Sequence, residues 1–170
     1  MSAAAVIDSI EFARAELELR GSLLVAGLFR LTDSLFDTEG TLHYELRGGV
    51  DELNRPHLTV KVEGPLNLQC QRCLERLQYA VDVSNTLVVV PPGAQPVEEI
   101  EDPEAPDTID ANAELDVAAL IEDEVLLSLP LAPRHAEWAC LGRLDQHHDA
   151  EEPRSAFAQL AALKQASDKR

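Results

Sequence analysis

Residues 57–90 read HLTVKVEGPLNLQCQRCLERLQYAVDVSNTLVVV and contain the clearest β-strand pattern in the chain. Apolar residues recur with a period of two before the central CQRC and again after it, which places them on one face of a β-strand. Gly64 and Pro65 interrupt the first half without shifting the period, so we expect a kink at an edge or a bulge there. The stretch predicts two long strands joined in a hairpin, with Cys70 and Cys73 at its tip.

Shorter elements are expected on either side of this hairpin. Helix formers at Ser9–Leu19 predict a short N-terminal helix, and the apolar stretch Leu23–Leu31, which contains Gly27, is consistent with a bulged strand. Alternation over Thr41–Arg47 predicts a half-buried strand. A helix is expected from Asp116, its N-cap, to Ser128, with a stop at Pro130. Its apolar stripe comprises Val117, Leu120, Ile121, Val125 and Leu129.

Two segments lack such patterns. Residues 91–110 are rich in proline and acidic residues, so they cannot bury enough apolar area to offset the entropy of ordering, and we expect a mobile acidic loop. Residues 146–170 are expected to form a flexible polar tail with a short amphipathic helix. The predicted fold is α+β: one domain over residues 1–145, with an antiparallel sheet centred on the long hairpin and covered by helices.

Charge excludes some classes of function. The chain of 170 residues has 14 Lys and Arg against 31 Asp and Glu, a net charge of −17. Between Leu77 and Pro133 there are 13 acidic residues and neither lysine nor arginine. Nucleic-acid affinity comes mainly from basic side chains that contact phosphate, so tight binding to naked RNA is not expected. The acidic stretch is either a solvated surface or a docking surface for a basic partner.

The sequence also allows a prediction of the cellular location. Apolar runs such as Leu87–Val90 are far shorter than the roughly 18 residues of a membrane span. The N-terminus lacks a basic region and reaches Asp8 too early for a signal peptide. We therefore expect a cytoplasmic protein that does not interact with membranes.

Four residues form a candidate metal site: Cys70, Cys73, His135 and Cys140. Two thiolates separated by two residues can bind one side of a tetrahedral zinc ion, and a histidine with a third cysteine would complete a Cys₃His set. Against this, 61 residues separate Cys73 from His135, which is longer than in common zinc modules. The alternative is a hairpin with reduced thiols and a surface histidine.

Other chemistry has less support. A redox dithiol would favour the N-terminus of a helix, whereas this cysteine pair is expected between strands. His147 and His148 lie in the polar tail and are expected to be exposed to solvent. The sequence has no phosphate-binding loop, no dinucleotide fingerprint and no hydrolase elbow. No catalytic or cofactor-binding residue is therefore predicted.

Four blocks in order make a family resemblance specific: GSLLVAGLFRL, LNLQCQRCLERL, ELDVAALIEDEVLLSLPLAPRH followed by Cys140, and SAFAQLAALK. The chain resembles the bacterial YceD family, the large ribosomal RNA subunit accumulation proteins. It departs from the family at Ser155 and Ala156, where Asn-Pro is common. The positions that match the family motifs, besides the four candidate ligands, are Arg72, Leu74, Glu75, Glu122, Glu124, Leu126, Leu127, Pro130 and Pro133.

The resemblance implies a non-enzymatic factor that supports 23S rRNA accumulation and biogenesis of the large ribosomal subunit. Because the chain is so acidic, we expect it to bind a basic ribosomal protein or assembly factor rather than RNA. An apolar patch near Leu129, Leu131 and the hairpin tip would set the lifetime of that complex. The alternative is a zinc- or thiol-dependent enzyme that uses Cys70, Cys73, His135 and Cys140.

Overall fold

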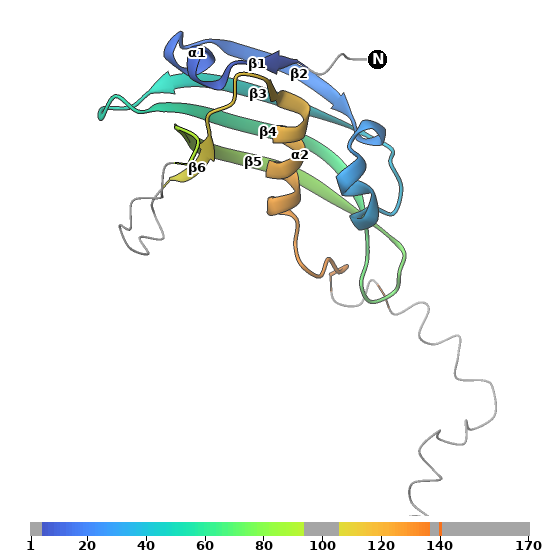
Figure 1. The fold of residues 1–170 in the computed structure, drawn as a ribbon. Helices are drawn as coiled ribbons and strands as arrows, with labels where there is room; N and C mark the ends of the chain where they lie inside the picture. The colour runs from blue at the N-terminus through green and yellow to red at the C-terminus, as the bar shows by residue number, and fades with distance from the viewer. Residues whose placement is uncertain (1–4, 94–105, 137–139, 141–170) are drawn as a thin grey trace, which may run out of the picture. The chain divides into compact units, whose positions relative to one another are not determined.

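The computed structural model describes residues 5–93, 106–136 and 140. Its main element is a five-stranded sheet with the strand order β2-β3-β4-β5-β6 (Figure 1). Neighbouring strands are antiparallel, except that β5 and β6 are parallel. The predicted α+β class with a mainly antiparallel sheet is therefore confirmed. The strands are β1 (Val6–Ile7), β2 (Glu18–Leu24), β3 (Thr41–Val50), β4 (Pro56–Gln69), β5 (Arg76–Val90), β6 (Asp107–Asp110) and β7 (Leu115–Asp116).

The long hairpin is formed by β4 and β5, which pair continuously from His57↔Val88 to Gln69↔Arg76. The apolar residues that alternate along β4 are almost completely buried and form the centre of the core. Pro65 lies beyond His43↔Glu63, the last pair between β3 and β4, so its missing N–H breaks no hydrogen bond to β3. The predicted hairpin is confirmed, and its register with β5 continues through Gly64 and Pro65 without a bulge.

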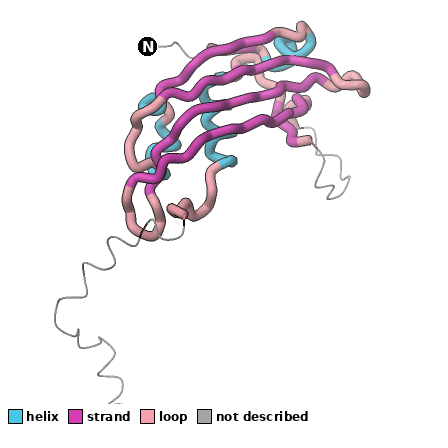
Figure 2. The backbone as a smooth tube through the Cα atoms, turned by 180° about the vertical axis from the view of Figure 1, so that it is seen from behind, coloured by secondary structure: helices cyan, strands magenta, loops and turns pink. Residues whose placement is uncertain are grey.

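Helices cover one face of the sheet. They are α1 (Ser9–Arg14), the 3₁₀ helices η1 (Val25–Gly27) and η2 (Phe29–Ser34), and α2 (Val117–Ser128). Figure 2 shows the strands from the other side, with the helices behind them. The helix predicted after Asp116 is confirmed, because the Asp116 carboxylate accepts hydrogen bonds from the N–H groups of Ala118 and Ala119. The core-facing residues of α2 are Val117, Leu120, Ile121 and Val125.

The predicted helix over Ser9–Leu19 is too long. Helix α1 ends at Arg14, and Glu16 adopts a left-handed backbone conformation with φ of 49°. From Glu18 onward, exposed and half-buried residues alternate, and β2 pairs with β3. Residues 18 and 19 have a moderate preference for helix, but pairing of β2 with β3 and burial of alternate side chains favour the strand.

The bulged strand predicted over Leu23–Leu31 is wrong. The stretch leaves β2 at Leu24 and continues as η1 and η2. Val25, Leu28 and Leu31 are buried, and their spacing of three residues is the period of a 3₁₀ helix. A glycine within an apolar run is also compatible with a bulged strand, so the local sequence does not distinguish the two structures.

The loop predicted over residues 91–110 contains a strand at its end. Residues Asp107–Asp110 form β6, which pairs with the last residues of β5 from Leu87↔Asp107 to Val90↔Asp110. Ile109 packs against the core and explains the ordering of this short segment. The middle of the predicted loop and the predicted tail at 146–170 lie outside the described residues.

Candidate metal centre and its surroundings

The tip of the hairpin is a short turn built by backbone hydrogen bonds. The N–H of Cys70 donates to the carbonyl of Glu75 over 3.0 Å, and the N–H of Leu74 donates to the carbonyl of Cys70 over 2.9 Å. Leu74 closes the turn with a left-handed φ of 62°, a conformation that costs about 1 kcal/mol for a residue with a side chain. Cys70 and Cys73 are therefore presented by one tight turn at the end of two long, well-packed strands.

The segment that follows α2 is attached to this turn. The phenol of Tyr79 on β5 donates to the carbonyl of Ser128, the last residue of α2, over 3.3 Å. The N–H of Gln71, between the two cysteines, donates to the carbonyl of Pro133 over 2.8 Å. The chain thus reaches the hairpin tip directly before His135, although this histidine is remote from the tip in sequence.

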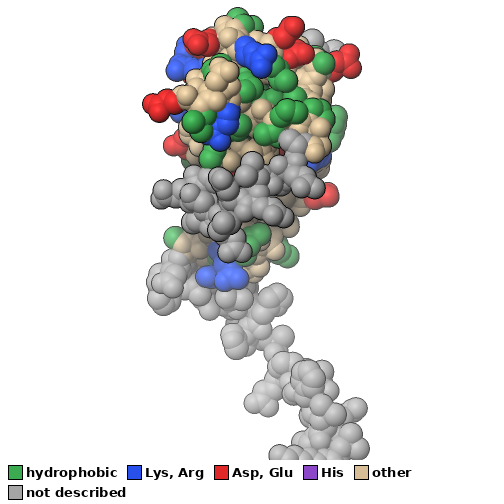
Figure 3. All heavy atoms as spheres, turned by 60° about the vertical axis from the view of Figure 1, so that its left-hand side comes forward, with side chains coloured by type: hydrophobic (Ala, Val, Ile, Leu, Met, Phe, Trp, Pro, Cys, Tyr) green, Lys and Arg blue, Asp and Glu red, His purple; other side chains and the backbone are tan. Residues whose placement is uncertain are grey.

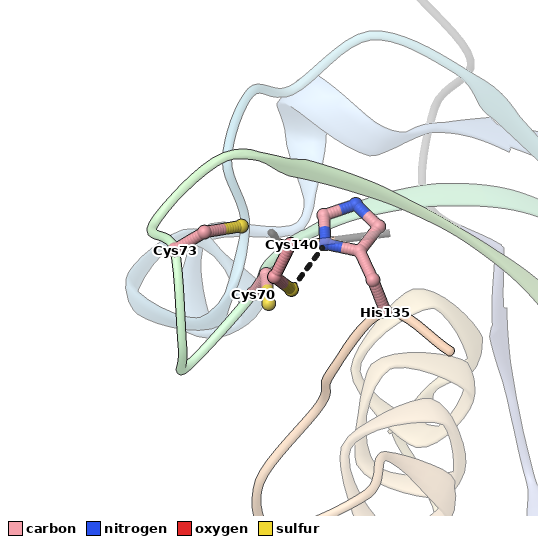
Figure 4. Close-up of side chains that lie close together, drawn as sticks. All are labelled: Cys70, Cys73, His135 and Cys140. Carbon is pink, nitrogen blue, oxygen red and sulfur yellow. Dashed lines mark hydrogen bonds between the residues drawn. The ribbon is translucent and has the colours of Figure 1, made fainter. Parts of the chain in front are cut away.

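Cys70, Cys73, His135 and Cys140 form one cluster (Figure 4). Their ligand atoms all lie within 4.8 Å of one another. The Sγ of Cys140 lies 3.5 Å from the Nδ1 of His135. Cys70 and Cys140 are buried, whereas Cys73 and His135 are half-buried. Ligand atoms of a tetrahedral zinc site lie about 4 Å apart, because each is about 2.0–2.3 Å from the ion, so these four residues could hold a metal ion.

Ionic and polar contacts hold the hairpin beside this cluster. The side-chain amide of Asn67 on β4 donates to the carboxylate of Asp37 over 2.9 Å. Arg76, the first residue of β5, forms ion pairs with Asp37 and Glu39 at 3.1 and 2.9 Å. Burial alone would raise the pKa of Asp37, but the Asn67 amide, the Glu39 N–H and the Arg76 charge together lower it. The connection before β3 is thereby fixed to the strands that carry the cysteines.

Two acidic residues on α2 that match the family motifs, Glu122 and Glu124, have defined hydrogen-bond partners. The Oε1 atom of Glu122 accepts hydrogen bonds from the N–H groups of Arg30 and Leu31, at 2.6 and 3.2 Å. Glu122 therefore caps η2 and joins it to α2. Glu124 points to another partner, because its Oε2 atom accepts a 3.0 Å hydrogen bond from the side-chain amide of Asn85 on β5.

Asn85 is a residue that sequence reasoning missed. It occupies the inward-facing position between Val83 and Leu87 on β5, where the alternation of the strand calls for an apolar side chain. Its amide donates both to Glu124 and to Asp107 on β6. A polar residue at a core position of an otherwise apolar strand was the available signal, since buried polar groups require partners.

The comparison with known proteins shows the family. Residues 58–164 match the family model described as the large ribosomal RNA subunit accumulation protein YceD. This chain belongs to the YceD family. The region matched in the YceD model begins in β4 and includes the hairpin tip, α2 and all four residues of the cluster.

One YceD relative matches along almost the whole chain. The chain is 30% identical over 169 residues to the large ribosomal RNA subunit accumulation protein YceD of Haemophilus influenzae, and the match covers 94% of each protein. No solved structure is significantly similar to the chain. Within the described residues, no helix has the length and apolar character needed to cross a membrane.

Proposed function

We propose that this protein supports the accumulation of 23S rRNA and the biogenesis of the large ribosomal subunit as a non-enzymatic, cytoplasmic binding factor. The observation that carries the proposal is the YceD match, which covers the hairpin tip, α2 and the Cys₃His cluster. The relative from Haemophilus influenzae has the same name as the family model, and its similarity extends over 94% of this chain. The similarity in sequence over these elements supports a shared role in rRNA accumulation.

A structural zinc ion is part of the proposal. The donor set of three cysteines and one histidine is typical of zinc sites whose four protein ligands complete the tetrahedral shell. A catalytic zinc keeps one position open for water or substrate, and a closed Cys₃His site does not. The ion would hold the hairpin tip to the segment after α2, in addition to the hydrogen bond from Gln71 to Pro133.

Exposed leucines close in sequence to the cluster support a binding role. Leu74 is 60% exposed and Leu131 is fully exposed, and both lie close in sequence to residues of the cluster. Leu74 also adopts the left-handed conformation that favours glycine or asparagine. Neither burial nor backbone geometry explains a leucine at this position, so its apolar side chain is available for contact with a partner.

The expected partner is a basic large-subunit ribosomal protein or assembly factor. On the described surface shown in Figure 3, acidic and basic side chains are interspersed. The excess of acid is concentrated in the sequence between Leu77 and Pro133, which has 13 acidic residues and no lysine or arginine. A field of this sign attracts a basic protein and repels RNA phosphates.

Deletion and complementation in a bacterium that carries this gene test the proposal. We expect deletion to lower 23S rRNA relative to 16S rRNA, and the wild-type chain to restore the ratio. The variant Leu74→Asp combined with Leu131→Asp should fold but restore 23S rRNA poorly. The matched control is Leu53→Asp, at a 72% exposed leucine in the turn between β3 and β4, and it should restore the ratio fully. A normal ratio in the deletion strain would refute the proposed function.

A further inference from the structure

A groove runs between α2 and the edge strand β6. Its volume is about 550 Å³. Leu120, Leu126 and Leu127 of α2 line one wall together with Asp123 and Glu124, while Leu87 on β5 and Asp107–Ile109 on β6 line the other. The groove thus combines an apolar surface with three carboxylates.

Two of these carboxylates share one neutral donor. The Nδ2 atom of Asn85 lies 3.0 Å from the Oε2 of Glu124 and 3.1 Å from the Oδ2 of Asp107. The Oδ1 of Asn85 is itself occupied, since it accepts a 2.8 Å hydrogen bond from the N–H of Thr86. Two negative groups from α2 and β6 are therefore brought together around the amide of a third element, β5.

Glu124 is the more buried of the two. Its residue is only 6% exposed, and a buried carboxylate is destabilising unless a cation or several donors balance it. In the part of the chain that the structure describes, neither Glu124 nor Asp107 forms an ion pair. Arg30, which also lines the groove, is paired with Asp123. The pair Glu124 and Asp107 therefore has unused acceptor capacity for an incoming cation.

The apolar wall identifies the kind of cation. Leu127 is 80% exposed at the groove, and Leu126 is only partly buried beside it. A hydrated metal ion would leave these leucines in water. Lysine and arginine instead carry an aliphatic stem below their charge, which covers apolar surface while the charged head reaches a carboxylate. An amphipathic basic segment could thus contact both the leucines and the carboxylates of the groove.

We propose that the groove between α2 and β6 binds an amphipathic basic segment of a protein partner, with a lysine or arginine side chain held by Glu124 and Asp107. This inference rests on the proposed function in that the partner is the basic ribosomal protein or assembly factor expected above. It adds a defined docking site with Glu124 as the specificity-determining residue and Leu127 as an apolar contact.

A peptide titration tests the site. The probe is a fluorescent amphipathic helical peptide of leucine and lysine, added to the full chain, with a second peptide that has glutamate in place of lysine. We expect the lysine peptide to bind, the glutamate peptide not to bind, and the shifts in amide NMR spectra to concentrate on α2 and β6. Glu124→Gln should weaken binding about tenfold, the loss expected for one charge-assisted hydrogen bond. Glu114→Gln, an exposed acid outside the groove, should change it less than about twofold.

A second variant, at an exposed residue, tests the groove without a risk of unfolding the protein. Leu127→Ser alters an exposed side chain and should also weaken the lysine peptide several-fold with an unchanged melting temperature. Binding that is equal in wild type, Glu124→Gln and Leu127→Ser would overturn the inference, as would shifts confined to the hairpin tip. Binding of calcium alone that depends on Glu124, without peptide binding, would overturn it too. None of these experiments measures rRNA. A negative result would therefore refute the peptide site in the groove without bearing on the proposed role in rRNA accumulation.

Discussion

The backbone N–H of Gln71 donates a 2.8 Å hydrogen bond to the carbonyl of Pro133. This contact joins the turn between the two cysteines of the hairpin to the segment that leads into His135. A spacing of 61 residues between Cys73 and His135 is therefore no obstacle to a common site. The turn between β4 and β5 contains Cys70 and Cys73. The segment after α2 contacts this turn and then continues to His135 and Cys140.

Metal content is the first prediction. Protein purified under reducing conditions should contain about one zinc ion per chain, because four ligand atoms within 4.8 Å form a complete Cys₃His set. Removal of the metal with a chelator should loosen the hairpin tip and leave much of the sheet intact, since the sheet has its own apolar core. Metal analysis and hydrogen exchange at residues near Cys70 and Gln71 measure both effects.

Cysteine variants provide the control for this experiment. Cys73→Ser should lower the zinc content strongly and raise hydrogen exchange at the tip. Its effect should disappear in chelated protein, where wild type and variant lose the same cross-link. A metal-free wild-type protein with readily alkylated thiols, and a silent Cys73→Ser variant, would show that the cluster holds no metal.

Helix α2 should provide a large part of the stability of the fold. Ile121 is completely buried against the sheet, so Ile121→Ala should lower the free energy of unfolding by about 2–5 kcal/mol. Leu120→Ala should fall in the same range. Leu127 is on the same helix but is 80% exposed, and Leu127→Ala should cost less than about 0.5 kcal/mol. Urea unfolding of the three variants tests this, and equal losses would contradict the observed orientation of α2.

The contact between α2 and η2 should depend on Glu122. Glu122→Ala would leave the N–H groups of Arg30 and Leu31 without their acceptor, at a cost of about 1–3 kcal/mol. Glu122→Gln keeps an acceptor oxygen and should cost less. Asp123→Ala removes only the exposed ion pair with Arg30 and should cost under about 1 kcal/mol. Similar unfolding midpoints for Glu122→Ala and Asp123→Ala would show that the cap is not important.

The sequence predicts the parts of the fold whose burial pattern is periodic. Alternation along β4 and β5 identified the hairpin, and the spacing of Leu120, Ile121 and Val125 identified α2. The strand β6 was missed, because a four-residue segment in an acidic, proline-rich stretch becomes a strand only through parallel pairing with β5. That pairing is a tertiary contact and has no local signature.

The candidate site could be predicted as a set of residues but not as a geometry. The chemistry of cysteine and histidine selected the four members of the cluster, whereas the tip turn and the Gln71–Pro133 contact that position them are long-range features. The groove was not predicted, although Asn85 at an inward position was a sign of it. Whether Asn85 would meet a backbone group or a carboxylate depends on the packing of α2 and β6.

Acid should weaken the turn between β3 and β4. The Arg55 N–H, the Arg55 guanidinium and the Leu53 N–H lower the pKa of Asp51 below its ordinary value of 3.8. The folded state therefore binds fewer protons at Asp51 than the unfolded state does. The resulting stability is present above about pH 3.8 and is lost as the pH falls through the lower, folded-state pKa. Asp51→Asn should be less stable than wild type at pH 6, and this difference should shrink as the pH falls below 3.8. A difference in urea midpoint that stays constant down to pH 2 would contradict it.

Electrostatic attraction should govern association with a basic partner. Naked 23S rRNA should bind poorly at physiological salt, because the chain has a net charge of −17 and phosphate contacts require lysine or arginine. Immobilised basic proteins of the large subunit should instead bind the chain, with an association rate that falls as salt increases.

Neutralisation of four acids at once isolates the contribution of the acidic segment. Glu98→Gln, Glu99→Gln, Glu101→Gln and Asp102→Asn together should slow association several-fold and leave the dissociation rate nearly unchanged, because charge steering acts before contact is made. The melting temperature should stay the same, since the composition of this segment predicts little contribution to the core. The matched control neutralises Glu11, Glu16, Glu52 and Glu63, exposed acids elsewhere on the chain, and should slow association less. Equal slowing by both sets would show that net charge alone matters, and tight binding to naked 23S rRNA would contradict the preference for a basic protein.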